Sequence, residues 1–452
     1  MANRTIGMTS SLNTSGIHDS NFASDQPTMG DTAVTTGEIA KPQDNLFDSV
    51  PDELLLSIFD ALSTDANKSL RRHEVNRLIR RLSLVCKRFR RAVIDTTSFW
   101  TKIDHPYCRK GGFETRLSRT KGAPLSIDMT GIEDMVPVER EEGLNRMMNL
   151  GSRWQCLRAR FGHMGWEDVL EGFSGREFPG LETAHLHFSP FGFAEAFFDE
   201  WKFPNLVSLR THNAIPPLTM YRGLSELNIS VNRTWLYEEQ HHEKLLESLK
   251  CVPRLERLSL HLAGNLTQTS APVPVPLPSL VFLSISNYYD PTASSQREGS
   301  ALHVAHFLES LQMPKVQDLR VALVFPDESR LDSWLDAEQR IRDALLTVTE
   351  TTIVTEFRLD RDFMRRLLPM FPNVRQLRLD TVRTLETLKS LNYYFWLRKL
   401  ESVQTVRWPG ESKAHFQRED LRIFSDDASV ICWDNIEPRS RKEQHPFHMG
   451  SG

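Results

Sequence analysis

The histidines and cysteines are the side chains in this sequence best suited to metal or covalent chemistry. His185 and His187 flank Leu186, so a strand would present both imidazoles on one face, at a spacing compatible with a metal pair. No third or fourth ligand is identifiable. Cys86 lies among apolar residues at helical spacing, which indicates a packing or interface residue and not a reactive thiol. We therefore expect solvated strand histidines and no metal site.

The sequence also contains none of the common catalytic motifs considered. The sequence holds no GxSxG, GxxxxGK or HExxH motif, and its five cysteines include no CxxC pair. We predict that the chain is not an enzyme, has no catalytic residue and uses no cofactor. An enzyme with unrecognised chemistry is the remote alternative.

The overall charge and composition limit the classes of partner that the chain is expected to bind. Of 452 residues, 55 are basic and 59 are acidic, giving a formal net charge of -4, so no global field favours nucleic acid or an anionic membrane. No apolar run is long enough to cross a bilayer. Scattered cysteines without a secretory signal favour a cytoplasmic or nuclear location.

The N-terminal part contains two predicted helices. Residues 1–44 are rich in small polar residues and are expected to form a disordered tail. Asp52 and Glu53, directly after Pro51, suit the start of a helix whose apolar residues continue to Leu62. A second helix is expected over 78–93. Together they carry more large apolar side chains than so small a unit can bury, so part of this surface should meet another protein.

Three blocks of this segment resemble the F-box: Val50–Phe59 (VPDELLLSIF), Leu82–Arg91 (LSLVCKRFRR) and Ser98–Ile103 (SFWTKI). We assign the F-box to 45–104. Val50 stands where the family usually has leucine, and the connector 63–76 is longer than usual. Nine basic residues between Arg71 and Arg91 are interpreted as the edges of a helix stripe, with nuclear import or nucleic-acid binding as the alternative.

The C-terminal part contains a recurring phrase, often Pro-x-Leu-x-x-Leu-x-Leu, whose end alternates apolar with polar residues as a half-buried strand does. It starts at residues 181, 206, 224, 255, 280, 316, 354 and 374. Helical patterns lie between the phrases, over 193–201, 237–252, 301–311, 331–348, 363–371 and 385–400. The irregular spacing resembles a degenerate leucine-rich repeat. The fold class is therefore α/β: an all-helical F-box, a connector or cap over 105–150, a solenoid over 151–435 and a disordered tail over 436–452.

These features together resemble a fungal, basidiomycete-type F-box protein. That resemblance implies a substrate-recognition adaptor of a cullin-RING ubiquitin ligase, in which the F-box binds a Skp-type adaptor, and through it a cullin, and the repeats bind an unknown protein substrate. The family motif places nine residues at the adaptor interface: Pro51, Leu54, Leu55, Ile58, Phe59, Leu84, Val85, Cys86 and Phe89.

Strand alternation gives the predicted substrate contacts. These outward positions are Arg210, His212, Asn228, Ser259, His261, Ser284, Arg320, Arg358, Asp360, Arg378 and Asp380. An F-box protein that acts as an interaction scaffold, without substrate turnover, is the main alternative function. The proline-rich stretch 268–279 is expected to be an extended loop, with a docking segment as its alternative.

Overall fold

The computed structural model describes residues 49–69, 72–104, 112–130, 137–162, 175–189, 201–217, 223–231, 240–263, 274–288, 307–324, 342, 345–355, 370–380 and 402–405. The chain divides into two compact units, residues 1–51 and 52–452, and of the first only 49–51 are described. The predicted tails at 1–44 and 436–452 lie outside the described residues. The elements below belong to the second unit.

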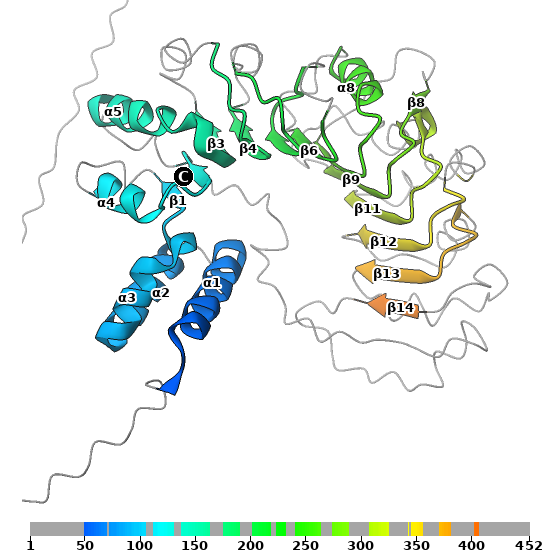
Figure 1. Cartoon of the computed structure of the whole chain (residues 1–452). Coiled ribbons are helices and arrows are strands. Elements are labelled where there is room, and N and C mark those ends of the chain that lie inside the picture. The colour runs from blue at the N-terminus through cyan, green and yellow to red at the C-terminus, as the bar shows by residue number, and fades with distance from the viewer. Residues whose placement is uncertain are drawn as a thin grey trace, which may run out of the picture. The chain divides into compact units, whose positions relative to one another are not determined.

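The N-terminal region is helical (Figure 1). Helices α1 (Asp52–Ser69), α2 (Arg72–Val85) and α3 (Lys87–Asp95) are followed by the 3-10 turn η2 (Thr97–Phe99). The single helix expected over 78–93 is thus two helices. Cys86 separates them because its backbone is extended (φ -159°, ψ 172°) and its Sγ accepts a hydrogen bond from the N–H of Phe89, which caps the start of α3. The predicted connector is shorter than expected, since α1 runs to Ser69.

A small apolar core holds these helices together. Phe59 of α1 lies at its centre, with edge-to-face contacts to Phe89 at 5.3 Å and Phe99 at 6.3 Å between ring centroids. Leu55, Ala92, Val93 and Trp100 complete the buried cluster. This core is separate from that of the remaining chain, so the helical region has its own packing.

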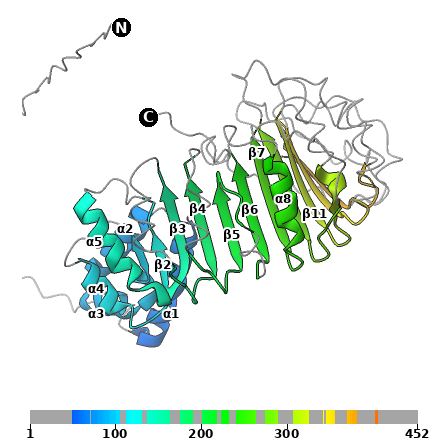
Figure 2. The same cartoon turned by 90° about the horizontal axis from the view of Figure 1, so that it is seen from above.

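The second part of the chain builds a parallel sheet. Twelve of the described strands pair in chain order, every neighbour parallel (Figures 1 and 2). The strands of this sheet are β1 (Lys102–Asp104), β2 (Leu125–Asp128), β3 (Trp154–Phe161), β4 (Thr183–Phe188), β5 (Ser208–His212), β6 (Glu226–Val231), β7 (Arg257–Ala263), β9 (Phe282–Tyr288), β11 (Asp318–Val324), β12 (Glu350–Thr355), β13 (Gln376–Asp380) and β14 (Ser402–Thr405). The structure is therefore mixed α/β, with a helical N-terminal region and a parallel sheet.

The recurring phrase explains most of these strands. Seven phrases coincide with β4, β5, β6, β7, β9, β11 and β13, and every apolar position of theirs that the structure describes is at most 2% exposed. Strands β1, β2 and β3 precede the first phrase, in segments assigned to the F-box, to the connector and to the start of the array. The sheet thus starts earlier in the chain than the repeat pattern predicts.

The prediction that one phrase lies at Val354, Phe357 and Leu359 was wrong. The register pairs Leu319 with Thr351 and Val321 with Ile353, so the buried phrase here is Val348, Thr351 and Ile353. Thr351 obscures the pattern because it occupies a leucine position. Its hydroxyl donates to the carbonyl of Leu319 at 3.2 Å, which satisfies a buried polar group.

A recurring turn leads into the strands. In six cases an apolar residue, a proline and one further residue precede the first apolar residue of the phrase, as in Phe203-Pro204-Asn205-Leu206. The N–H of Leu206 donates to the carbonyl of Phe203, and the same bond forms in the other five turns. Proline suits the second position of such a turn because its φ is already close to the required value. The turns fix where each strand starts.

Helices cover the apolar face of the sheet. Helices α4 (Gly112–Arg119), α5 (Pro137–Met148) and α8 (Gln240–Lys250) contribute buried side chains, among them Phe113, Met147 and Leu249, to the core that the strands form. Helix α8 confirms the helix predicted over 237–252; most residues of the helices expected over 193–201, 331–348, 363–371 and 385–400 lie outside the described residues. The 3-10 turn η5 (Gly151–Arg153) precedes β3, and the short strands β8 (Val275–Pro276) and β10 (Leu311–Gln312) pair with each other.

Gly180 offers a test of the close packing at these turns. A Cβ at this position would lie 2.9 Å from the carbonyl oxygen of Trp154 and 3.1 Å from that of Ser152, both backbone atoms that cannot move aside alone. We predict that Gly180→Ala lowers the free energy of unfolding by about 1–3 kcal/mol. Thermal unfolding followed by circular dichroism measures it. The control is Gly112→Ala at the start of α4, where no atom lies within 4 Å of the new Cβ; equal losses in both variants would contradict the packing argument.

Candidate functional site

Helix α1 carries two apolar stripes. Leu55 and Phe59 face the helical core and are 4% and 2% exposed, whereas Leu54 and Ile58 are 56% and 51% exposed. Residues one position apart lie about 100° apart around a helix, so the two stripes point in different directions. Leu62 continues the exposed stripe. The helical core is thus complete while large apolar side chains of α1 lie in solvent.

The end of α2 adds a second exposed apolar group. Leu84 is 67% exposed, and Val85 and Cys86 beside it are also exposed. Six of the nine predicted interface residues are therefore exposed: Pro51, Leu54, Ile58, Leu84, Val85 and Cys86. Leu55, Phe59 and Phe89 are placed in the core, where they support the exposed stripe and are inaccessible to a partner. Helical periodicity alone did not separate the two sets.

Polar contacts fix the orientation of these helices. Arg88 of α3 pairs with Asp52 of α1, with 2.6 Å between Nε and Oδ1. This pair links the start of α1 to α3. Because Asp52 is well exposed, its contribution to stability is small, and its main effect is on geometry.

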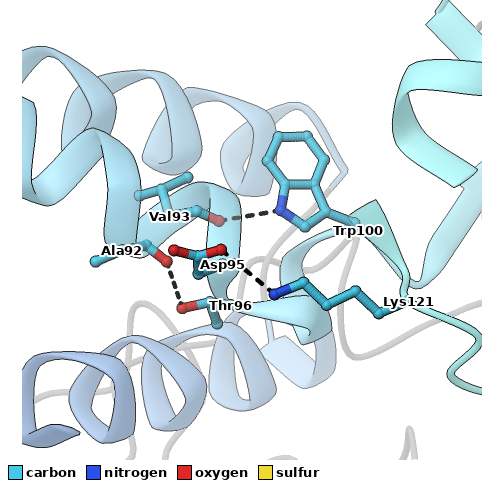
Figure 3. Close-up of polar contacts among 6 residues, drawn as sticks. All are labelled: Ala92, Val93, Asp95, Thr96, Trp100 and Lys121. Carbon is cyan, nitrogen blue, oxygen red and sulfur yellow. Dashed lines mark hydrogen bonds and ion pairs between the residues drawn. The ribbon is translucent and has the colours of Figure 1, made fainter. Parts of the chain in front are cut away.

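The end of α3 is tied to the segment that follows (Figure 3). The indole N–H of Trp100 donates to the carbonyl of Val93 at 3.0 Å, and the hydroxyl of Thr96 donates to the carbonyl of Ala92 at 2.8 Å. Lys121 pairs with Asp95 at 3.3 Å. In addition, the guanidinium of Arg119 on α4 lies 4.3 Å from the centre of the Trp100 ring. Trp100 thus connects the helical region with α4.

The predicted substrate contacts form two rows across the sheet. The Arg210 row contains the residues in register with Arg210: Arg158, His185, Arg210, Asn228, Ser259, Ser284, Arg320 and Thr352. The His212 row, two residues further along each strand, contains Arg160, His187, His212, Ser230, His261 and Ser286. Both rows lie on the face opposite the apolar core, because side chains alternate along a strand.

Seven predicted contacts thus lie together on one polar face. By backbone register Arg378 continues the Arg210 row and Asp380 pairs with Val354, while Arg358 and Asp360 lie outside the described residues. Seven members were not predicted as contacts: Arg158, Arg160, His185, His187, Ser230, Ser286 and Thr352. The alternation of arginine with buried residues in β3 was the signal that could have found two of them.

The histidines of this face interact with one another and with serines. The rings of His187 and His212 stack with centroids 4.3 Å apart. Nδ1 of His212 lies 3.0 Å from Oγ of Ser230, and Nδ1 of His261 lies 2.6 Å from Oγ of Ser286. Which atom carries the proton in each pair depends on the tautomer.

Burial lowers the pKa of His185, His212 and His261 to about 4. Positive neighbours contribute to the same lowering of the pKa: Arg158 and Arg210 act on His185, and Arg210 acts on His261. On His212 the largest neighbouring contribution comes from His187. The three imidazoles are therefore neutral at pH 7, and the positive charge of this face comes from its arginines.

Other chemistry finds little support in the described residues. They contain no group of three or more histidine, cysteine or acidic side chains placed to hold a metal ion. Burial raises the pKa of the Cys156 thiol, which makes it a poor nucleophile. No helix in the described ranges has the length and apolar character needed to span a membrane.

Comparison with known protein families identifies one domain. The sequence pattern of the F-box-like family matches residues 47–106, which contain helices α1 to α3, η2 and β1. A comparison with curated proteins gives no match for the chain. The N-terminal region is thus an F-box-like domain, and F-box domains generally bind Skp-type adaptors.

The lowered histidine pKa values make stability depend on pH. Since the folded protein favours the neutral form, the contribution is complete above about pH 6.5, the ordinary value for histidine, and is lost as the pH falls towards about 4. We predict a lower thermal midpoint at pH 5 than at pH 7. In the variant His185→Gln, His212→Gln, His261→Gln this decrease should be smaller, because glutamine does not titrate. An unchanged decrease would rule out these histidines as its source.

Proposed function

We propose that this protein is the substrate-recognition subunit of a cullin-RING ubiquitin ligase, acting in the cytoplasm or nucleus. Its F-box-like domain binds a Skp-type adaptor, which connects it to a cullin, and its polar sheet face holds a protein substrate. The sheet is interpreted as a degenerate leucine-rich-repeat array. Parallel strands in chain order and a recurring phrase that starts at a turn support this interpretation.

The main observation in support of this proposal is that the F-box-like domain exposes large apolar side chains on α1 and at the end of α2. Leu54, Ile58 and Leu84 are large, apolar and more than half exposed, although the helical core beside them is closed. Because these side chains are already partly buried, covering the remainder would contribute about 1–2 kcal/mol each. A partner helix that covers them would gain that free energy without rearranging the core. The adaptor contact is therefore assigned to the six exposed residues, and Leu55, Phe59 and Phe89 are assigned a supporting role.

In this role the chain needs no catalytic residue. A substrate held on the sheet is brought close to ubiquitin carried by another subunit, so the reaction is accelerated through effective concentration. The interface residues act by burial, and the sheet residues act by binding. The proposal therefore requires neither cofactor nor metal.

Substitutions in the exposed stripe test the adaptor contact. We predict that Leu54→Asp with Ile58→Asp reduces co-purification of the full chain with a Skp-type adaptor to about a tenth or less, because two charges would be buried at the interface. Both positions are exposed, so the circular dichroism spectrum and the thermal midpoint should stay close to those of the parent.

The matched control is Val138→Asp on α5, where the side chain is 69% exposed and the chemical change is similar. This variant should bind the adaptor as the parent does. Undiminished adaptor binding by the Leu54→Asp, Ile58→Asp variant would refute the interface. Ubiquitin transfer to a captured partner, in a reaction reconstituted with cullin and RING subunits, separates the ligase role from that of a scaffold.

A further inference from the structure

Three arginines gather at one part of the polar sheet face. Arg158 and Arg210 lie on β3 and β5 in the Arg210 row, with His185 of β4 between them in register. Arg160 lies on β3 in the adjacent His212 row. All three arginines are exposed, and we name them the arginine patch.

Among the residues that the structure describes, no carboxylate forms an ion pair with the arginine patch. Asp128 is in register with Arg158, but its carboxylate accepts hydrogen bonds from the N–H and hydroxyl of Thr130, at 3.1 and 2.6 Å. Glu226 acts on Arg210 only as a more distant negative charge. The patch therefore keeps a net positive charge.

Other arginines on the same face are used differently. Arg320 pairs with Asp318 at 3.5 Å, and its guanidinium lies 4.9 Å from the centre of the Phe282 ring. Arg257 lies 4.1 Å from the same ring. These side chains have partners within the protein, whereas the arginine patch offers its donors to solvent. The contrast distinguishes the arginine patch from the arginines of β7 and β11.

The spacing of the patch suits an extended peptide. Strands two apart in a sheet are separated by about 10 Å, and three residues of an extended chain also span about 10 Å. A polyproline II segment has three residues per turn and rises about 3.1 Å per residue, so acidic groups three residues apart point the same way. Such a segment crossing β3, β4 and β5 would thus place two of them opposite Arg158 and Arg210. His185, neutral at pH 7, lies between them as a hydrogen-bonding group.

We propose that the arginine patch binds an acidic segment of a protein partner, with anionic side chains three residues apart at Arg158 and Arg210 and a further contact to Arg160. Guanidinium groups bind carboxylate and phosphate through paired hydrogen bonds, so aspartate, glutamate and phosphoserine share the required chemistry. Only the role of this partner as the ubiquitination substrate rests on the proposed function.

A polynucleotide fits the patch less well. Binding of nucleic acid generally uses many positive side chains along a track, whereas this patch covers three strands. In the row that contains Cys156 and Thr183, the following strands present three carboxylates, Glu226, Asp318 and Glu350, and one arginine, Arg257. Those carboxylates would repel a phosphate backbone extended in that direction.

Peptides immobilised on an array test the proposal with the full chain. Each twelve-residue probe carries two glutamates, or two phosphoserines, separated by one to five positions in a glycine–serine background; matched probes carry glutamine or serine. We expect binding to anionic pairs, strongest when they are three residues apart. Fluorescence anisotropy then measures affinity. Arg158→Gln with Arg210→Gln should weaken binding at least about tenfold.

The control variant is Arg254→Gln, which removes an exposed arginine in the turn before β7, outside both rows, and should change peptide affinity less than about twofold. Adaptor co-purification is measured on each variant, so loss of peptide binding with the adaptor retained concerns the patch alone. The proposal is overturned if anionic and neutral probes bind equally, if the double variant binds as the parent does, or if single-stranded DNA binds more tightly than every acidic probe.

Discussion

Side-chain alternation along parallel strands, kept in register from one strand to the next, is the constraint on which the rest of the sheet depends. Strands such as β3 and β4 bury alternate residues in the apolar core and turn the others towards the polar face. Because neighbours stay in register, a polar residue on one strand lies beside the equivalent residue of the next. Strand register alone therefore brings together arginines and histidines that are far apart in the sequence. The polar face is thus a direct consequence of how the core is built.

The helical region differs from the sheet in how it distributes its apolar residues. Helix α1 has apolar residues on more of its circumference than its own domain can bury, so Leu55 and Phe59 close a core while Leu54 and Ile58 stay outside it. Core packing and solvent exposure are therefore divided between different residues of one helix. Loss of a core residue would affect folding first, whereas loss of an exposed residue would leave the core intact.

Much of this organisation could be predicted from local patterns, and the differences have physical reasons. The F-box motif and the recurring phrase located helices and strands, because both depend on spacing within a few residues. The phrase at β12 was missed because Thr351 satisfies its hydroxyl through the neighbouring strand, a contact that depends on tertiary structure. The break at Cys86 depends on a weak sulfur cap that helical periodicity does not reveal. Likewise, the choice between Leu54 and Leu55 as exposed residue requires knowing where α3 packs.

Strand β1 belongs to two parts of the protein at once. Lys102–Asp104 falls within the F-box-like match and also forms the edge of the sheet beside β2. Recombination that exchanged the N-terminal domain at its sequence boundary would also exchange this edge, leaving β2 with an unfamiliar neighbour or with unpaired backbone groups. Any N-terminal domain joined to β2 would therefore have to supply three residues that reproduce this parallel pairing.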